Sequence, residues 1–256
     1  MASRNLSTSQ TGVTSDSAPI VLLHGFTQTS GCWGPFAEQL GRIRSILAFD
    51  LPGHGGSADV RADLSGTADL LASAITPSTI IGYSLGGRIA LHLALTRPEL
   101  VQRLVLIGAT AGIDEVDERR QRRVADEILA DHIEEVGVAV FLDEWLNQPL
   151  FSTLPIERSH LEVRLTNSAE GLASSLRLCG TGTQESLWDR LQELSMPVLV
   201  LAGDLDEKFT RLGHRLVQAI GTNASFIAIG DAGHSAQLEK PEATAAAVIG
   251  WLAQSP

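Results

Sequence analysis

Six short apolar runs constrain the fold of this 256-residue chain more than any other feature of its sequence. They lie at residues 20–23, 46–49, 79–81, 104–107, 198–201 and 226–229. A continuous apolar run of this length is typical of a strand that is buried on both faces. Stretches with helical character at residues 89–95, 210–220 and 243–252 separate or follow these runs. This alternation predicts an α/β fold with a mostly parallel sheet that is flanked by helices.

One interval, residues 112–194, interrupts the alternation because it contains no strand-like run and is rich in charged, helix-compatible sequence. It follows the fourth predicted strand, so it should lie over the crevice in which such sheets bind ligands. We expect a helical cap at 112–194, inserted into a core of residues 18–111 and 195–256. Residues 1–17, rich in Ser and Thr, are expected to be a flexible N-terminus. Residues 11–13 could add one edge strand, although Gly12 weakens that case.

The charge balance indicates which partners the chain lacks. Its formal net charge is −11, from 19 Lys and Arg against 30 Asp and Glu. Such a surface repels phosphate groups, so we expect no nucleic-acid or membrane partner. Only Lys208 and Lys240 are lysines, which leaves 17 arginines among the 19 cations. The planar guanidinium group suits carboxylates, and this bias favours a local basic site within an acidic molecule.

The two cysteines, Cys32 and Cys179, lie far apart and lack the spacing of a metal or redox motif. Each is expected to be a small buried thiol. The first seventeen residues contain no apolar block like that of a signal peptide, and no stretch is long enough to span a membrane. These features predict a cytoplasmic protein and leave its oligomeric state unknown.

The segment Gly82-Tyr83-Ser84-Leu85-Gly86 has the pattern G-x-S-x-G and lies between a predicted strand and a predicted helix. In that context the serine occupies a sharp turn with strained backbone angles, and the glycines let neighbouring segments pass closely. The hydroxyl is then exposed at the positive end of the helix. Ser84 is therefore predicted to be catalytic rather than an incidental turn serine.

A catalytic serine of this kind needs a histidine base and an acid that orients it, in the chain order Ser, acid, His. His234 follows the sixth predicted strand and is the candidate base. Asp204 and Asp206 both follow the fifth strand, and we favour Asp206 because it lies further out on the loop. All of these positions lie at carboxyl ends of strands, so the side chains can converge at one edge of the sheet.

An oxyanion hole requires two backbone N–H groups that point at the developing negative charge. Leu85, directly after the serine, is expected to supply one of them. Phe26, in the loop after the first predicted strand, is expected to supply the other. His24 in the same loop is expected to be structural rather than a second base.

In these positions the chain resembles the α/β-hydrolase superfamily from about residue 20 onward. Further blocks are similar to the 2-succinyl-6-hydroxy-2,4-cyclohexadiene-1-carboxylate synthases of menaquinone biosynthesis. These blocks are residues 82–88 (Gly-Tyr-Ser-Leu-Gly-Gly-Arg), 145–151 (Trp-Leu-Asn-Gln-Pro-Leu-Phe), 171–177 (Gly-Leu-Ala-Ser-Ser-Leu-Arg), 180–184 (Gly-Thr-Gly-Thr-Gln) and 206–209 (Asp-Glu-Lys-Phe). General esterases share the serine motif but not this set, so the resemblance is fairly specific.

The resemblance implies a carbon–oxygen lyase that eliminates pyruvate from a cyclohexene bearing an enolpyruvyl ether and several carboxylates. It implies that Ser84, His234 and Asp206 serve proton abstraction, and that the oxyanion hole stabilises an enolate. It implies no metal and no organic cofactor. The implied substrate-binding residues are Tyr83, Arg88, Arg122, Trp145 and Arg164.

Simpler interpretations of these residues stay open. Arg122 belongs to a charge run at residues 119–123 and could pair with Asp126 one helical turn away. Trp145 could be ordinary cap core. Arg88 has a weaker alternative, because it follows Ser84 by four residues on the first turn of the next helix.

Two other functions also stay open. A serine carboxylesterase or carbon–carbon bond hydrolase would share the fold and the three catalytic residues. A non-catalytic binding protein on the same fold is a third interpretation, which the complete Ser-Asp-His set disfavours. If the arginines do bind a small multi-carboxylate substrate, the net charge describes a negative exterior with a positive pocket beneath the cap.

Overall fold

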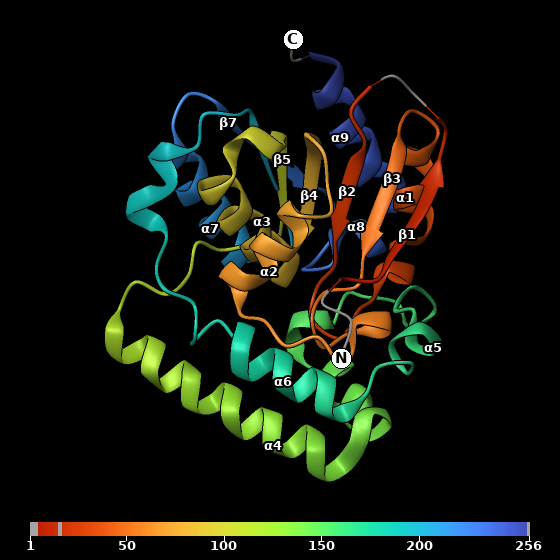
Figure 1. Cartoon of the computed structure of the whole chain (residues 1–256), viewed down its shortest axis with the longest axis vertical. Helices are drawn as coiled ribbons and strands as arrows, with labels where there is room; N and C mark the ends of the chain where they lie inside the picture. The colour runs from red at the N-terminus through yellow and green to blue at the C-terminus, as the bar shows by residue number, and fades with distance from the viewer. Residues whose placement is uncertain (1–4, 15–16, 255–256) are drawn as a thin grey trace.

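The structure, a computed structural model that describes residues 5–14 and 17–254, contains within these residues a seven-stranded sheet (Figure 1). Its strands are β1 (Thr8–Gly12), β2 (Ile20–Leu23), β3 (Ser45–Phe49), β4 (Ser78–Tyr83), β5 (Val101–Ile107), β6 (Val198–Gly203) and β7 (Ala224–Ile229). Their order is β1-β3-β2-β4-β5-β6-β7, and β1 alone runs antiparallel to its neighbour. The mostly parallel sheet expected from the sequence is confirmed, and each of the six apolar runs lies in a strand.

Strand β1 differs from the flexible N-terminus that the sequence suggested. Residues 8–12 pair with β3, and Gly12 lies opposite Ser45. Leu6 is buried, and the Asp50 amide donates a hydrogen bond to the Ser7 carbonyl, so this segment is fixed to the sheet by long-range contacts. The prediction for residues 1–17 also covers 1–4 and 15–16, which lie outside the described residues.

Helices cover both faces of the sheet, because alternate residues of its strands point into two apolar clusters. Val21 and Leu23 of β2 belong to one cluster, which includes residues of α2 (Leu64–Ala72), α3 (Leu85–Thr96) and α7 (Glu207–Ile220). Ile20 and Leu22 belong to the other, with residues of α1 (Gly34–Gly41), α8 (Ala236–Glu239) and α9 (Pro241–Gln254). Short 3₁₀ turns lie at η1 (Ser30–Trp33), η2 (Gly55–Ser57) and η3 (Pro98–Leu100).

The segment between β5 and β6, expected to be the cap, consists of helices and turns. It contains α4 (Val116–Leu146), η4 (Pro149–Phe151), η5 (Ile156–Arg158), α5 (Leu161–Arg164), α6 (Ala169–Cys179) and η6 (Trp188–Glu193). In Figure 1 α4, α5 and α6 lie together below the ends of the strands. Helices α4 and α6 share a small apolar cluster that includes Ile133 and Leu172. The domain limits at 111/112 and 194/195 stay a prediction.

The strand order places a crevice at the carboxyl ends of β2 and β4. Strand β2 pairs with β3 on one side and with β4 on the other. The chain therefore first places a strand on one side of β2 and then crosses to its other side. Ligands bind to such sheets where the strand order reverses in this way. The loops that follow β2 and β4 both open into this crevice, and the Gly86 amide donates to the His24 carbonyl at 3.0 Å. None of the described helices has the length and apolar character of a membrane span.

Candidate active site

Ser84 occupies a strained turn between β4 and α3. Its φ of 49° and ψ of −106° form a conformation that residues other than glycine seldom adopt. The turn requires glycine at both ends of the motif. A Cβ atom on Gly86 would lie 1.9 Å from the Leu23 carbonyl oxygen, and one on Gly82 would lie 2.4 Å from the Gly86 oxygen. The turn therefore has the geometry that the G-x-S-x-G pattern predicts.

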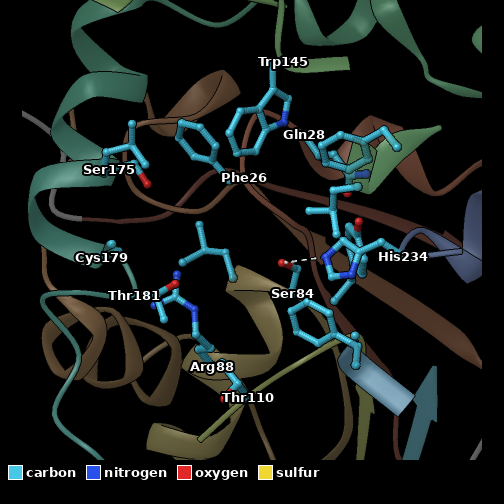
Figure 2. A pocket seen from close by; sticks show the side chains of 18 of the residues that line it. Phe26, Gln28, Ser84, Arg88, Thr110, Trp145, Ser175, Cys179, Thr181 and His234 are labelled. Carbon is cyan, nitrogen blue, oxygen red and sulfur yellow. Dashed lines mark hydrogen bonds between the residues drawn. The ribbon is translucent and has the colours of Figure 1, made fainter. Parts of the chain in front are cut away.

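His234 and Asp206 extend from Ser84 in a continuous hydrogen-bonded series. His234 Nε2 lies 3.4 Å from Ser84 Oγ, the contact dashed in Figure 2, and His234 Nδ1 lies 3.0 Å from Asp206 Oδ2. Asp206 Oδ1 also accepts the Phe209 amide at 3.0 Å, which caps the N-terminus of α7. Asp204 is exposed. The geometry therefore favours Asp206 over Asp204 as the acid of the triad.

The surroundings of Asp206 keep its carboxyl group ionised. Burial acts to raise the pKa of Asp206, but the hydrogen bonds from His234 and the Phe209 amide outweigh it and lower the pKa below the ordinary value. A carboxylate only accepts hydrogen bonds, so His234 Nδ1 carries the proton in this contact. The lone pair of Nε2 is then free to accept the Ser84 proton.

The loop that carries His234 is held by a buried carboxylate that sequence reasoning missed. Glu239 of α8 accepts the Gly233 amide at 2.7 Å and the Ser235 amide at 3.0 Å, so it binds the backbone on both sides of His234. The Tyr83 hydroxyl lies 2.7 Å from Ser235 Oγ in the same region. Burial is the main cause that raises the pKa of Tyr83 far above its usual range.

The two amides expected to form the oxyanion hole are free. Phe26 and Leu85 line one pocket with Ser84, and their N–H groups have no acceptor within the described part of the chain. The adjacent amides are engaged: that of Gly25 donates to Gln28 Oε1 at 3.1 Å, and that of Gly86 donates to His24. The Phe26 and Leu85 amides are therefore free donors beside Ser84, and their role in an oxyanion hole stays a prediction.

Two buried histidines hold the loop that contains Phe26. The Leu51 amide donates to His24 Nε2 at 3.0 Å, and the Thr27 amide donates to His54 Nε2 at 3.3 Å. Burial lowers the pKa of His24 to about 4 and that of His54 to about 3, so both rings are neutral acceptors near pH 7. His24 thus has the structural contacts that the sequence suggested.

Among the residues that the structure describes, the pocket beside Ser84 is lined by cations and by no Asp or Glu. The cations among its described lining residues are Arg88, Arg122, Arg164 and Lys208. This composition is the reverse of the whole chain, whose net charge is −11. The positive pocket beneath the cap follows from the tertiary structure. Among the described residues, no group of three or more His, Cys, Asp or Glu side chains is placed to hold a metal ion.

Arg88 and Arg164 are buried cations that form no salt bridge with any described residue. Arg88 is 8% exposed, donates to Gln184 Oε1 at 3.2 Å, and has its pKa lowered by burial to about 10. Arg164 is 1% exposed and donates to the Ser159 carbonyl at 2.7 Å and to the Thr27 hydroxyl. Burial also lowers the pKa of Arg164. Because a buried charge is costly without a counter-charge, both side chains are suited to bind an anionic ligand.

Arg122 forms the expected ion pair with Asp126 and also lines the pocket. Its Nε donates to Asp126 at 2.7 Å, one helical turn away, while its side chain is 43% exposed and lines the pocket. Within the charge run at residues 119–123, Arg119 donates to the Ile113 carbonyl and Arg120 pairs with Asp117. Arg122 is thus the arginine of this run that faces the crevice.

Trp145 belongs both to the aromatic packing of the cap and to the pocket wall. Its ring packs against Phe26 and Phe141 in the cap, with centroid distances of 5.3 and 5.7 Å, and it lines the pocket. Its buried Nε1 has no hydrogen-bond partner in the described structure. Sequence reasoning missed Lys208 and Phe209, which line the pocket as well. Both follow Asp206 closely, so their position after β6 is a signal that could have identified them.

The chain is similar to known proteins over most of its length. The family model described as the alpha/beta hydrolase family matches residues 20–247. A relative from Bacillus subtilis is 35% identical over 241 residues, which are 88% of this chain and 86% of that protein. A relative from Yersinia pestis, named 2-succinyl-6-hydroxy-2,4-cyclohexadiene-1-carboxylate synthase, is 34% identical over 92% of this chain and 88% of its own.

Solved structures are similar over nearly the full length. The structure of MenH from S. aureus superposes with a TM-score of 0.89 at 30% identity and covers 98% of both chains. A thermophilic esterase from Thermogutta terrifontis, solved with malate bound, superposes with a TM-score of 0.79 at 25% identity and covers 97% of this chain and 93% of its own.

Proposed function

Since the chain belongs to the α/β-hydrolase family, and within it to the 2-succinyl-6-hydroxy-2,4-cyclohexadiene-1-carboxylate synthases, we propose that it is a carbon–oxygen lyase of menaquinone biosynthesis. Its substrate is then 2-succinyl-5-enolpyruvyl-6-hydroxy-3-cyclohexene-1-carboxylate, and its products are the cyclohexadiene and pyruvate. The pocket lined by four cations and no acid supports this assignment most directly, because the substrate carries several carboxylates.

The proposed reaction begins with proton transfer along the triad. Ser84 Oγ gives its proton to His234 Nε2, and Asp206 stabilises the imidazolium that forms. The serine oxygen takes the proton from the ring carbon beside the succinyl carbonyl. The electron pair of that C–H bond moves through the ring double bond and breaks the ring C–O bond, so the enolpyruvyl group leaves. Enolpyruvate then takes up a proton and becomes pyruvate.

The oxyanion hole and the cations stabilise different parts of this transition state. The free amides of Phe26 and Leu85 donate to the succinyl carbonyl oxygen as negative charge develops on it. Arg88 and Arg164 bind carboxylates, and their guanidinium groups can donate in a forked geometry. Arg122, Tyr83 and Trp145 complete the proposed substrate contacts. Binding of the carboxylates positions the ring against Ser84 and so lowers the entropic part of the barrier.

The direct test supplies the purified chain with the enolpyruvyl cyclohexene and follows pyruvate with a coupled lactate dehydrogenase. We expect release well above the spontaneous elimination, and release at the spontaneous rate would refute the assignment.

Arg88→Ala should lower kcat/KM at least about a hundredfold, because it removes a charge-assisted contact to substrate. Arg97→Ala is the matched control, since Arg97 directly follows α3 and pairs at the surface with Asp69. A near-normal Arg88→Ala enzyme would remove Arg88 from the site.

A serine hydrolase is the second candidate, favoured by the hydrogen-bonded Ser84–His234–Asp206 arrangement and the likeness to the malate-bound esterase. Such an enzyme would accumulate a covalent acyl group on Ser84 with an ester substrate. Intact-protein mass spectrometry in a rapid quench distinguishes the two, because the lyase forms no acyl-enzyme. If the wild type turns over no substrate and Ser84→Ala binds the ligand as tightly as the wild type does, the chain would instead be a binding protein.

The cytoplasmic location remains a prediction from the sequence. Cys32 and Cys179 are both free and buried, a state that fits a reducing compartment. Fractionation of cells that express the native chain would test it, and recovery with secreted proteins would contradict it.

A further inference from the structure

Gln28 is buried in the pocket wall, yet half of its side-chain amide is unpaired. The residue is 2% exposed and lines the pocket beside Ser84. Its Oε1 accepts the Gly25 amide at 3.1 Å, whereas its Nε2 has no hydrogen-bond partner within the described structure. Because the Gly25 N–H can donate only to an oxygen, this contact fixes which end of the amide is the NH₂ group. The unpaired end is therefore a donor.

Donors also dominate the surroundings of Gln28. Trp145 Nε1, on the same side of Ser84 in Figure 2, is a second buried donor that has no partner among the described residues. Arg164 donates to the hydroxyl of Thr27, the residue that precedes Gln28, and lines the same pocket without a carboxylate partner. Three donors and no acid at one end of the pocket fit a group that only accepts hydrogen bonds, and a carboxylate is such a group.

The opposite side of Ser84 carries a separate cation. Figure 2 shows Arg88 and Thr181 across from Gln28 and Trp145, with the Ser84 hydroxyl between the two sides. A substrate with carboxylates at both ends would therefore span the serine. Gln28 contributes to only one of these ends, so its effect can be separated from that of Arg88.

We propose that Gln28 is a substrate-binding residue that donates from Nε2 to a carboxylate oxygen held by Arg164 and Trp145. This inference rests on the proposed function only in that the substrate is a small multi-carboxylate. The Gly25 contact gives the residue a second effect, because it orients the amide before the substrate arrives and so reduces the entropy lost on binding.

The test uses two replacements of similar size. Gln28→Glu keeps an acceptor for the Gly25 amide but replaces the donor with a negatively charged oxygen, which repels the carboxylate. Gln28→Met removes both the donor and the acceptor of the Gly25 amide, without adding charge. We expect KM for the enolpyruvyl cyclohexene to rise about tenfold in Gln28→Met and more in Gln28→Glu, because a hydrogen bond to a charged group is lost. The kcat should stay within about twofold, since the contact exists before and during the reaction.

Gln237→Met is the matched control. Gln237 is also buried, and its amide is unpaired within the described part of the chain, but it does not line the pocket, so its replacement should leave KM unchanged. Thermal unfolding of each variant establishes that it is folded. Equal KM values for the wild type and both folded Gln28 variants would overturn the proposal, as would equal increases in Gln28→Met and Gln237→Met.

Calorimetric titration with succinate separates this proposal from the lyase assignment, because it requires no turnover. Weaker succinate binding to Gln28→Glu than to the wild type supports the carboxylate contact even if the wild type releases no pyruvate. If the wild type releases pyruvate but binds succinate with the same affinity as Gln28→Glu, the lyase assignment stands. The proposal that Gln28 binds the substrate is then wrong.

Discussion

The function of a single residue in this site depends on which atoms its side chain contacts, as Asp204 and Asp206 show. The two are separated by one residue on the loop after β6. Asp206 contacts His234 and caps α7, whereas Asp204 is exposed. Their sequence context differs little, so the distinction depends on where the loop turns relative to His234.

Asp206→Asn is expected to lower kcat by about 10²–10⁴, because the asparagine cannot stabilise the imidazolium or hold its tautomer. Asp204→Asn should leave kcat within about twofold and serves as the control. Steady-state pyruvate release measures both. The reverse ranking of the two variants would assign the acid to Asp204.

At the scale of elements, helix α4 depends on a break at Gly137. This residue has φ 78° and ψ 168° inside an otherwise helical segment. The break separates the charged first part of the helix from the part that carries Phe141 and Trp145 to the pocket and cap core. Such backbone angles are open to glycine and strained for other residues.

Two glycines with equally open surroundings test this point. A Cβ atom would meet nothing within 4 Å at either Gly137 or Gly250, but Gly250 lies within helix α9 and lacks the positive φ. Gly137→Ala should lower the free energy of unfolding by about 1–3 kcal/mol through backbone strain. Gly250→Ala should raise it by about 0.5–1 kcal/mol, because alanine favours the helix. Urea unfolding measures both, and a stabilised Gly137→Ala variant would exclude the break.

For the whole molecule, the buried histidines couple stability to pH. The pKa of His24 is lowered to about 4 and that of His54 to about 3, mainly by burial, from an ordinary value of 6.5. Between pH 6.5 and about 4 the unfolded chain therefore binds protons that the native chain does not. Stability falls as the pH falls through this window. The lowered pKa of Asp206 acts in the same direction at lower pH.

Each histidine that titrates only on unfolding should contribute about 1.4 kcal/mol per pH unit to this slope. Urea unfolding at several pH values between 7 and 4 gives the slope for the wild type. His54→Gln should reduce this slope by the contribution of one histidine, about 1.4 kcal/mol per pH unit, because one group fewer binds a proton on unfolding. An identical slope in His54→Gln would show that His54 does not stay neutral in the folded chain.

Much of the fold and part of the site could be predicted because they depend on local sequence. All six apolar runs form strands, and the runs in β2, β4, β5 and β6 are buried along their whole length, whereas the run in edge strand β7 is only half-buried. The strained turn at Ser84 requires glycine nearby in the chain. Ser84, Asp206 and His234 each follow a parallel strand. Because the carboxyl ends of these strands meet at one edge of the sheet, the convergence of the three side chains could be predicted. Helices α1 and α2 were not predicted, since eight and nine residues show little more than two turns of periodicity.

Tertiary structure decided what depends on contacts between distant segments. It fixed strand β1, whose register is set by β3 rather than by its own polar sequence. It buried Arg164 through contacts with Thr27, 137 residues earlier, and left Gln28 Nε2 without an acceptor. It also excluded every acidic side chain from the described pocket lining. The sequence by itself determined the strands, the serine turn and the net charge, because these follow from local pattern and composition. Only the folded chain decided where that charge lies, because electrostatic environment is a property of spatial neighbours.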